Sequence, residues 1–303
     1  MNVYAGLDLG GSSLKFGIGN RTEGLINFRT IKHQNSGREE IFGLLKRAVS
    51  EILDNCSEKY ILKAIALGSP GYIDNFNGEI LYNSPNLKGW VGSNPVNYLA
   101  QQFKLPVFIE NDANLMAFGE SKVARRDRGS LLGITIGTGI GSGFVHDNRI
   151  YHGSFSAALE LGHTIIEPDG KRCACGKSGC LEAYAAIPPL EEEAGSITGK
   201  KRNIDYILEV YKTDSDIARI INKAYDRIGL VIANTVTILD PGYVVIGGGL
   251  TECPAFNIQP LSNSLKKYLN RYQSNHVQIE RATLKNRAGV WGAVNLAEKS
   301  FDE

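Results

Sequence analysis

The chain has 303 residues, of which 43% are hydrophobic, and its 33 basic and 32 acidic side chains give a formal net charge of +1. This length suggests two domains, and the composition is that of an ordinary globular protein. No basic run is long enough to predict a nucleic-acid surface, and no stretch approaches the ~20 apolar residues of a membrane span. We therefore expect small molecules or other copies of the chain as partners, and neither nucleic acid nor a membrane.

Strand and helix patterns alternate in the first half of the chain. The predicted elements are strands over 3–9, 14–18, 62–67 and 105–109 and helices over 38–53 and 113–123. The first strand runs into Asp8, Gly10 and Gly11, and apolar alternation resumes directly afterwards, which is typical of a tight turn between two strands. The helix over 38–53 carries its apolar residues at helical spacing. We infer a β-β-β-α-β unit, of whose first three strands the pattern locates two, followed by a further strand and helix.

The same pattern begins again near residue 130. The later predicted elements are strands over 131–136 and 243–246 and a helix over 215–239. A glycine-rich turn at 137–143 separates the first of these strands from its return at 144–145, so both halves open with strand, glycine turn and strand. Asp214 or Ser215 can cap the long helix, and the second strand runs into glycines at 247–249. We expect a duplicated architecture.

One histidine and three cysteines lie within a short stretch of the chain. These candidate metal ligands are His163, Cys173, Cys175 and Cys180. Four such ligands fill a tetrahedral zinc shell, whereas a catalytic zinc keeps one position open, so we expect a structural zinc. Glu160 and Glu182 stand at the two ends of the segment. The metal would hold both carboxylates in one fixed geometry.

The four residues of this cluster could also have more ordinary roles. Closely spaced cysteines also form disulfides, and an isolated histidine is usually an ordinary core or surface residue. Against these roles, no apolar signal segment is found at residues 1–6, so we expect a cytoplasmic protein, in which disulfides are rare. Cys56 and Cys253 lie far from the cluster in the sequence and are expected to be ordinary thiols.

Glycine-rich turns follow three of the predicted strands, at 10–11, 137–143 and 247–249. Without a Cβ, such a turn lets a phosphate approach its backbone N–H groups, although each turn alone could also serve a tight hairpin. Ser142 breaks the dinucleotide G-x-G-x-x-G pattern, and the phosphate-loop pattern G-x-x-x-x-G-K-[ST] does not occur in the sequence. The three turns together predict a nucleotide held between two domains.

Polar residues follow the strand predicted over 105–109 and precede a helix. Glu110, Asn111 and Asp112 begin this segment, and side chains at such a position belong to the rim of a cleft. Asn and Asp here could also merely cap the helix. A carboxylate in a cleft can take the proton of an alcohol that attacks a phosphate. Different residues of the segment could fill the two roles.

With these features the chain resembles the ROK family of sugar kinases and sugar-responsive repressors, which has the actin-like and hexokinase-like ATPase fold. The matching segments are residues 8–12, 83–90, 110–120, 137–143, 160–163, 173–182, 247–249 and 288–297. The metal segment and the Asn-Asp-Ala-Asn sequence at 111–114 are the most specific of these matches. The resemblance runs nearly from end to end.

The resemblance implies an α/β fold of two domains, an actin-like (ribonuclease H-like) ATPase fold with an interdomain cleft. We expect a small N-terminal α/β domain over 1–112, rejoined by a C-terminal helix over about 288–303. A larger α/β domain over 113–287 would carry the zinc-binding segment 163–180. Because the family is often dimeric or tetrameric, a homodimer or homotetramer is expected.

The resemblance also implies an ATP-dependent kinase of a hexose, with glucose as the expected substrate and N-acetylmannosamine or N-acetylglucosamine as alternatives. Asp112 would be the general base that takes a proton from the 6-hydroxyl of the sugar. The implied sugar contacts are Asn86, Asn111, Glu160, His163 and Glu182. The implied contacts of the nucleotide and Mg²⁺ are Asp8, Gly10, Gly11, Ser12, Gly137, Thr138, Gly139, Gly248 and Gly249. Lys15 could add a charge near the phosphates, but a surface position is favoured because lysines are mostly exposed.

The chain departs from the family pattern just before the zinc ligand His163. Ser156 and Leu159 stand where glycines are usual. Leu159 lies next to Glu160, so we expect it to reshape the pocket around the 2-position or the anomeric carbon of the sugar. The departure touches neither the expected base nor the expected zinc ligands.

Two functions of other classes compete with the kinase. A sugar-responsive repressor of this family carries an additional N-terminal helix-turn-helix, for which the strand that starts at residue 3 leaves no room, so DNA binding is not expected. A zinc hydrolase that uses Glu160 or Glu182 as a base would need an open coordination position, and the four ligands fill the shell. A sugar-binding regulator without catalytic activity stays as an alternative.

Overall fold

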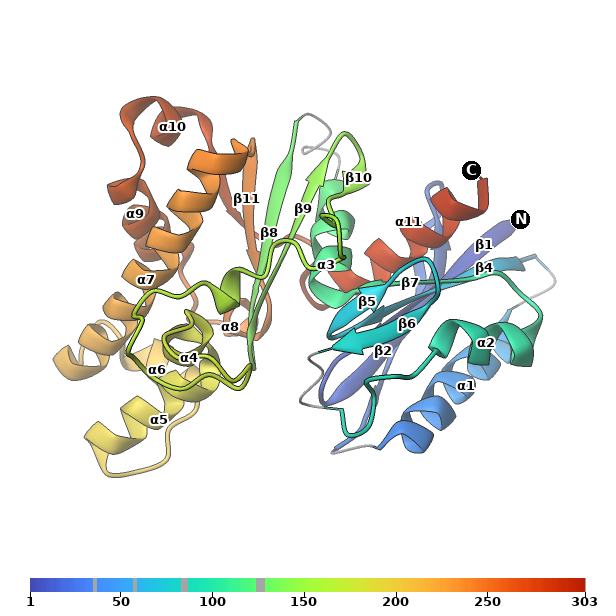
Figure 1. The fold of residues 1–303 in the computed structure, drawn as a ribbon, viewed down its shortest axis with the longest axis horizontal. Coiled ribbons are helices and arrows are strands. Elements are labelled where there is room, and N and C mark those ends of the chain that lie inside the picture. Colours follow the sequence, from blue (N-terminus) through green and yellow to red (C-terminus); the bar gives the residue numbers. More distant parts are fainter. Residues whose placement is uncertain (35–36, 57–58, 83–86, 124–128, 303) are drawn as a thin grey trace. The chain divides into compact units, whose positions relative to one another are not determined.

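The computed structural model describes residues 1–34, 37–56, 59–82, 87–123 and 129–302 (Figure 1). The chain divides into two compact units. The first unit consists of Met1–Lys122, Ile150–Ala158 and Arg287–Glu303, and the second of Val123–Arg149 and Leu159–Asn286. Each unit therefore has its own core, and the chain passes between them more than once.

A five-stranded sheet forms the centre of the first unit, in the order β3-β2-β1-β4-β7. The strands of this unit are β1 (Asn2–Leu9), β2 (Ser13–Asn20), β3 (Gly24–Lys32), β4 (Ile61–Ser69), β5 (Tyr72–Asp74), β6 (Glu79–Tyr82) and β7 (Val107–Asn111). Its helices are α1 (Arg38–Asn55), α2 (Pro95–Phe103), α3 (Asp112–Ser121) and α11 (Ala288–Asp302). Leu7 and Ile65 of the sheet and Leu45 of α1 lie fully buried in one cluster. The short strands β5 and β6 pair with each other as a separate hairpin. Neither strand was predicted from the sequence.

The second unit repeats this plan with a sheet in the order β10-β9-β8-β11-β12. Its strands are β8 (Leu131–Ile136), β9 (Ile140–His146), β10 (Arg149–Ile150), β11 (Tyr243–Gly247) and β12 (Gln278–Arg281). Its helices are α4 (Glu182–Ala185), α5 (Ile187–Thr198), α6 (Ile204–Val210), α7 (Ser215–Leu239), α8 (Gly249–Glu252), α9 (Ile258–Tyr268) and α10 (Arg271–His276). Short 3₁₀ turns occupy Leu161–His163 and Lys285–Arg287.

The two sheets share more than the number of strands. In both, the first strand pairs antiparallel with the next one along the chain, β1 with β2 and β8 with β9. In both, it also pairs in parallel with a later strand, β4 or β11. The duplicated architecture predicted from the sequence is therefore confirmed.

The long helix α7 has the predicted bounds. The side chain of Asp214 accepts hydrogen bonds from the backbone N–H groups of Asp216 and Ile217, at 3.0 and 3.1 Å, and so caps its start. Asp240 ends the helix in the left-handed conformation, with φ of 47°. Apolar residues at helical spacing, such as Ile221 and Ile228, are buried in the core of the second unit.

The strand predicted over 105–109 lies two residues further along the chain, at Val107–Asn111. Parallel pairing with β4 fixes this register, since it runs from Ile65 opposite Val107 to Ser69 opposite Asn111. Because the strand lasts until Asn111, α3 follows without a loop and begins at Asp112. The register of β7 thus sets the position of the candidate base.

The C-terminal helix α11 lies very close to β1 and α3, at positions where the neighbouring residues are glycines. A Cβ on Gly6 of β1 would meet the carbonyl oxygen of Val290, and one on Gly119 of α3 would lie 2.9 Å from the backbone nitrogen of Gly292. This contact joins the C-terminal helix to the first unit. It also draws α3 into that unit, which extends to Lys122, past the expected boundary at residue 112.

The helices also bear on the question of a membrane. Within the described ranges, none of them has the length and apolar content that crossing a membrane requires.

The close approach of α11 can be tested with two glycine substitutions. A Cβ on Gly292 would collide with the carbonyl group of Leu115, so Gly292→Ala is expected to destabilise the protein by ~1–3 kcal/mol through overpacking. Gly43, on the exposed face of α1, has nothing within 4 Å of a Cβ, and Gly43→Ala is expected to stabilise by about 1 kcal/mol. Thermal and urea unfolding of both variants checks the prediction. Equal stability of the two variants would contradict the packing described here.

Candidate functional site

Asp112 opens α3 in the first unit and lies near a second carboxylate, that of Asp8 at the end of β1. Burial and the charge of Asp8 raise the pKa of Asp112 from 3.8 to about 6, and the positive charge of Lys15 opposes the rise. The Nζ atom of Lys15 lies 3.4 Å from Oδ2 of Asp8, and its side chain is only 26% exposed. Lys15 thus faces the acidic pair. The exposed surface position that was favoured from the sequence is not the one in the structure.

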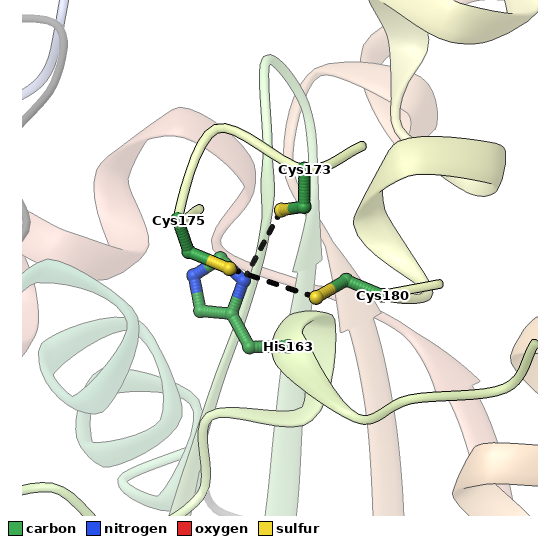
Figure 2. A group of neighbouring side chains, drawn as sticks. All are labelled: His163, Cys173, Cys175 and Cys180. Carbon is green, nitrogen blue, oxygen red and sulfur yellow. Dashed lines mark hydrogen bonds between the residues drawn. The ribbon is translucent and has the colours of Figure 1, made fainter. Parts of the chain in front are cut away.

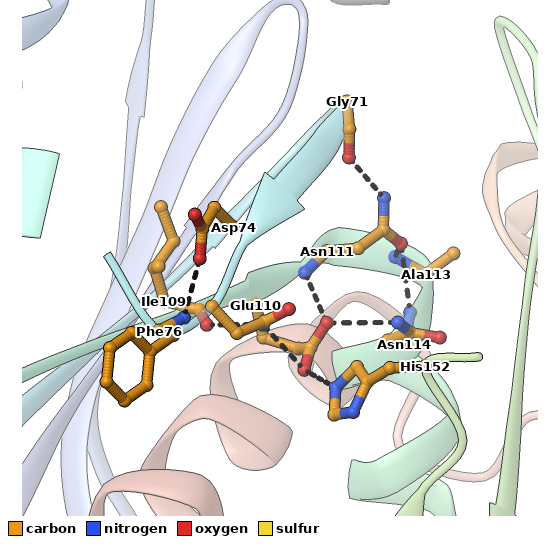
Figure 3. A network of polar contacts seen from close by, with 10 residues as sticks. Gly71, Asp74, Phe76, Ile109, Glu110, Asn111, Ala113, Asn114 and His152 are labelled. Carbon is orange, nitrogen blue, oxygen red and sulfur yellow. Dashed lines mark hydrogen bonds and ion pairs between the residues drawn. The ribbon is translucent and has the colours of Figure 1, made fainter. Parts of the chain in front are cut away.

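Asn111 caps the same helix. Its Oδ1 atom accepts hydrogen bonds from the backbone N–H groups of Ala113 and Asn114, at 2.9 and 3.2 Å. Its Nδ2 atom donates to the carbonyl oxygen of Gly71, at 3.2 Å (Figure 3). These bonds leave one hydrogen of the amide for a further acceptor. Capping by Asn111 and a chemical role for Asp112 are therefore compatible, as the sequence suggested.

Glu110 has an unusual position for a carboxylate, because it is only 2% exposed. Its Oε1 atom accepts from the backbone N–H of Asn111 at 2.8 Å and from Nδ2 of Asn114 at 3.0 Å. Its Oε2 atom accepts from Nδ2 of Asn75 at 3.1 Å and lies 2.5 Å from Nε2 of His152 (Figure 3). Neither Asn75 nor His152 was singled out from the sequence, since a pair of polar residues far apart along the chain has no local pattern.

His33, which directly follows β3, contacts the first glycine turn, at Gly10 and Gly11. The backbone N–H of Gly10 donates to the carbonyl oxygen of Ser13 at 2.9 Å. Nε2 of the buried His33 lies 3.0 Å from the carbonyl oxygen of Gly10, and the backbone N–H of His33 donates to the carbonyl oxygen of Ser12 at 3.0 Å. With its carbonyl groups bound from one side, the turn has a fixed conformation next to Asp8.

The predicted metal ligands come together in the second unit (Figure 2). The ligand atoms of His163, Cys173, Cys175 and Cys180 all lie within 4.8 Å of one another. Nδ1 of His163 is 3.7 Å from Sγ of Cys173, and the Sγ atoms of Cys175 and Cys180 are 3.6 Å apart. A zinc tetrahedron with Zn–S bonds of about 2.3 Å has S–S edges of about 3.8 Å, so the donor set fits a structural zinc. All five cysteines of the chain are free thiols, which excludes the disulfide alternative in this structure.

Glu182 connects the metal segment to the second glycine turn. It begins α4 two residues after Cys180, and its Oε2 atom accepts a hydrogen bond from the backbone N–H of Ile140 at 2.8 Å. A Cβ on Gly139 would collide with this carboxylate, so only glycine permits the approach. The sequence predicted that the metal fixes Glu182 but missed the contact with the turn.

The second and third glycine turns are neighbours. A Cβ on Gly137 would lie 3.7 Å from the backbone nitrogen of Gly249, and Gly137 donates its own N–H to the carbonyl oxygen of Gly139 at 2.9 Å. Gly248 has φ of 86°, and a Cβ there would lie 2.5 Å from the nitrogen of Ile136. Thr138, which follows Gly137, lines a surface groove together with Arg172, Glu182 and residues of α5.

Asn86 and Glu160 are two further residues that the sequence predicted as sugar contacts. Asn86 lies outside the described residues. Glu160 is half-buried and directly precedes the 3₁₀ turn that ends at His163, whose backbone N–H donates to the carbonyl oxygen of Glu160 at 3.0 Å. Glu160 thus lies next to the metal segment, and its role as a sugar contact stays a prediction.

The two departures from the family pattern have the same backbone conformation. Ser156 has φ of 52° and Leu159 has φ of 62°, both in the left-handed region that favours glycine. The segment has kept the backbone of a glycine-containing loop without its glycines. Leu159 packs in part against the core of the second unit, and its carbonyl oxygen accepts a hydrogen bond from the hydroxyl of Ser142, which offset the strain.

Comparison with known proteins shows to which family the chain belongs. The model of the ROK family matches residues 4–300. The chain belongs to the ROK family. This result confirms the resemblance drawn from the sequence.

Relatives within the family include enzymes and regulators. The chain is 30% identical to a glucokinase of Halalkalibacterium halodurans, over 99% of the chain and 97% of that enzyme. The crystal structure of a ROK family glucokinase from Streptomyces griseus with glucose and AMPPNP is similar, with a TM-score of 0.85, 26% identity and coverage of 98% of this chain and 99% of that one. A xylose repressor of Caldicellulosiruptor bescii is 28% identical over 96% of the chain, which spans 77% of the repressor. These likenesses confirm the two-domain actin-like ATPase fold and support sugar phosphorylation.

The metal cluster can be tested by removing one ligand. Cys180→Ser is expected to lose most of the zinc, from about one ion per chain, because serine replaces the thiolate in a closed shell. Loss of the ion should also lower the unfolding temperature, since the segment from Glu160 to Glu182 loses its anchor. Metal analysis of purified protein measures the first effect and thermal unfolding the second. Cys56→Ser, far from the cluster, is the control and should keep its zinc; full zinc content in Cys180→Ser would disprove the assignment.

The raised pKa of Asp112 predicts a stability cost that can be measured. Since the folded-state pKa of about 6 exceeds the usual 3.8, ionised Asp112 destabilises the fold above about pH 6, and the cost disappears as the pH falls toward 4. Asp112→Asn should therefore stabilise the protein at pH 8 by up to about 3 kcal/mol and much less at pH 4. The exposed Asp169 provides a control, as Asp169→Asn should change stability by less than about 0.5 kcal/mol at either pH. A stabilisation that is the same at both pH values would contradict the assignment.

Proposed function

We propose that this chain is an ATP-dependent hexose kinase that phosphorylates glucose on its 6-hydroxyl, with Asp112 as the general base. The observation that carries the proposal is the state of Asp112: a half-buried carboxylate at the start of α3 whose pKa is raised to about 6. A general base works best when its pKa lies near the working pH. An aspartate that only capped a helix would gain from a low pKa instead.

The reaction transfers one phosphoryl group. The oxygen of the sugar hydroxyl forms a bond to the γ-phosphorus of ATP, the bond from that phosphorus to the bridging oxygen breaks, and ADP leaves with the electron pair. Asp112 takes the proton of the hydroxyl on its carboxylate. Mg²⁺ would neutralise charge on the phosphate oxygens, and Asp8 is the residue proposed to hold it.

The remaining roles follow the family resemblance. We assign the other hydroxyls of the sugar to Asn86, Asn111, Glu160, His163 and Glu182. Asn111 has one amide hydrogen beyond the one that it donates to Gly71. Glu182 accepts from Ile140 with Oε2, and its Oε1 lies 3.9 Å from Sγ of Cys173. His163 directs Nδ1 toward the thiol of Cys173, at 3.7 Å. Zinc would then act as a scaffold and take no part in the transfer.

Backbone groups would hold most of the nucleotide. The proposed contacts are Asp8, Gly10, Gly11, Ser12, Gly137, Thr138, Gly139, Gly248 and Gly249. In support, the turns of Gly137 and Gly249 are neighbours in the second unit, and a groove with the basic residue Arg172 opens beside Thr138. Glycines at these positions permit close approach of phosphate oxygens to the backbone.

An assay that couples ADP release to a change in absorbance tests the proposal. With Mg²⁺ and ATP, the wild type should turn over glucose faster than mannose, fructose, allose, N-acetylglucosamine and N-acetylmannosamine. Asp112→Ala should lower kcat by 100-fold or more with little change in sugar affinity, because general-base catalysis contributes about 10²–10⁴-fold. The kcat/KM of the wild type should also fall as the pH drops below about 6, because this ratio reports the free enzyme, in which Asp112 is then protonated.

Different outcomes of this assay lead to different conclusions. Faster turnover of an acetamido sugar would assign the chain to N-acetylmannosamine or N-acetylglucosamine and implicate Leu159, which stands beside the sugar contact Glu160. Turnover that survives in Asp112→Ala would refute the role of Asp112. No turnover with any sugar by folded, zinc-loaded protein would favour a sugar-binding regulator.

A further inference from the structure

A buried carboxylate stands two residues before the proposed base. Glu110 belongs to β7 and is 2% exposed, and hydrogen bonds reach both of its oxygens (Figure 3). Removing a carboxylate from water costs several kcal/mol unless donors replace the lost solvent. The donors therefore determine where this carboxylate lies.

Two of the donors belong to the start of α3. The backbone N–H of Asn111 and the side-chain amide of Asn114 both bind Oε1 of Glu110. Asn111 is the cap of the helix and Asp112 its first residue. The position of the Glu110 carboxylate thus fixes the backbone on which Asp112 stands.

The other oxygen, Oε2, depends on side chains from elsewhere in the unit. Asn75, which follows β5, donates to it at 3.1 Å, and Nε2 of His152 lies 2.5 Å away. His152 comes from the segment Ile150–Ala158, which belongs to the first unit although the chain on either side of it belongs to the second. The bond to Glu110 raises the pKa of His152, which favours the charged imidazolium beside the carboxylate.

We propose that His152 is a positioning residue for the phosphoryl transfer: by binding Oε2 of Glu110 it holds the carboxylate that orients Asn111 and, through the backbone, Asp112. The inference rests on the proposed function, in which Asp112 is the base. His152 does not touch the reacting atoms in this scheme. A displacement of the base by about 1 Å can lower turnover by about 100-fold without loss of substrate binding.

Three variants test the inference, because the amides of glutamine and asparagine reach different ring positions of histidine. Glutamine can place its amide nitrogen near the position of Nε2, whereas the shorter asparagine reaches only that of Nδ1. We expect His152→Gln to keep kcat within about threefold of the wild type. His152→Asn and His152→Ala should lower kcat about 10- to 100-fold, with the KM of the sugar and of ATP changed by less than about threefold. His146→Ala, a histidine of the second unit that is 63% exposed, is the matched control and should behave as the wild type.

The outcomes separate this inference from the proposed function. Wild-type turnover that His152→Ala and His152→Asn leave unchanged would overturn the inference alone. A rise in both KM values with unchanged kcat would also overturn it, since it would show a role in shaping the substrate site and not in aligning the base. No turnover by the wild type with any sugar would overturn both proposals. If His152→Ala does not fold, the contrast between His152→Gln and His152→Asn decides the question.

Discussion

The contact of α11 with β1 and α3 is the constraint on which the first unit depends. The helix can lie so close only because Gly6, Gly119 and Gly292 carry no side chain. A Cβ on a fourth glycine, Gly289 at the start of α11, would lie 2.7 Å from the carboxyl group of Asp8. The same helix therefore packs against the end of β1 and along α3, which carry Asp8 and Asp112. Burial, and after it the charge of Asp8, raises the pKa of Asp112. The close packing of α11 thus contributes to the acid–base properties of Asp112.

In the second unit, hydrogen bonds and a cluster of candidate metal ligands fix the polar groups. A hydrogen bond from the backbone N–H of Ile140 to Glu182 holds the second glycine turn, and Sγ of Cys173 lies 3.9 Å from the other carboxylate oxygen of Glu182. A short loop of this kind has few apolar contacts with which to fix itself, so a closed shell of thiolates and imidazole can supply the rigidity. Close packing of α11 thus fixes polar groups in the first unit, and a cluster of one histidine and three cysteines that could hold a metal ion does so in the second.

Local patterns in the sequence sufficed for much of this structure. The bounds of α7 followed from its apolar spacing and the cap at Asp214, and the metal ligands followed from their spacing alone. The register of β7 could not be predicted, because pairing with β4 sets it, and the contact of Glu110 with His152 joins residues 42 positions apart. Such long-range polar pairs depend on the fold. The left-handed backbone at Ser156 and Leu159 was not predicted either, since neither residue type favours that conformation.

The return of α11 to the first unit also has a consequence for how the chain is made. Tyr4, Ala64 and Leu115 share a buried cluster with Ala293 and Val294 of α11. Tyr4, Ala64 and Leu115 are translated before the second unit, and α11 is translated after it. Their apolar side chains therefore lack the contacts with α11 while the second unit is being made. That unit needs no residue beyond Asn286, and it can fold first although it is made second. The core of the first unit can therefore be completed only after α11 has been made.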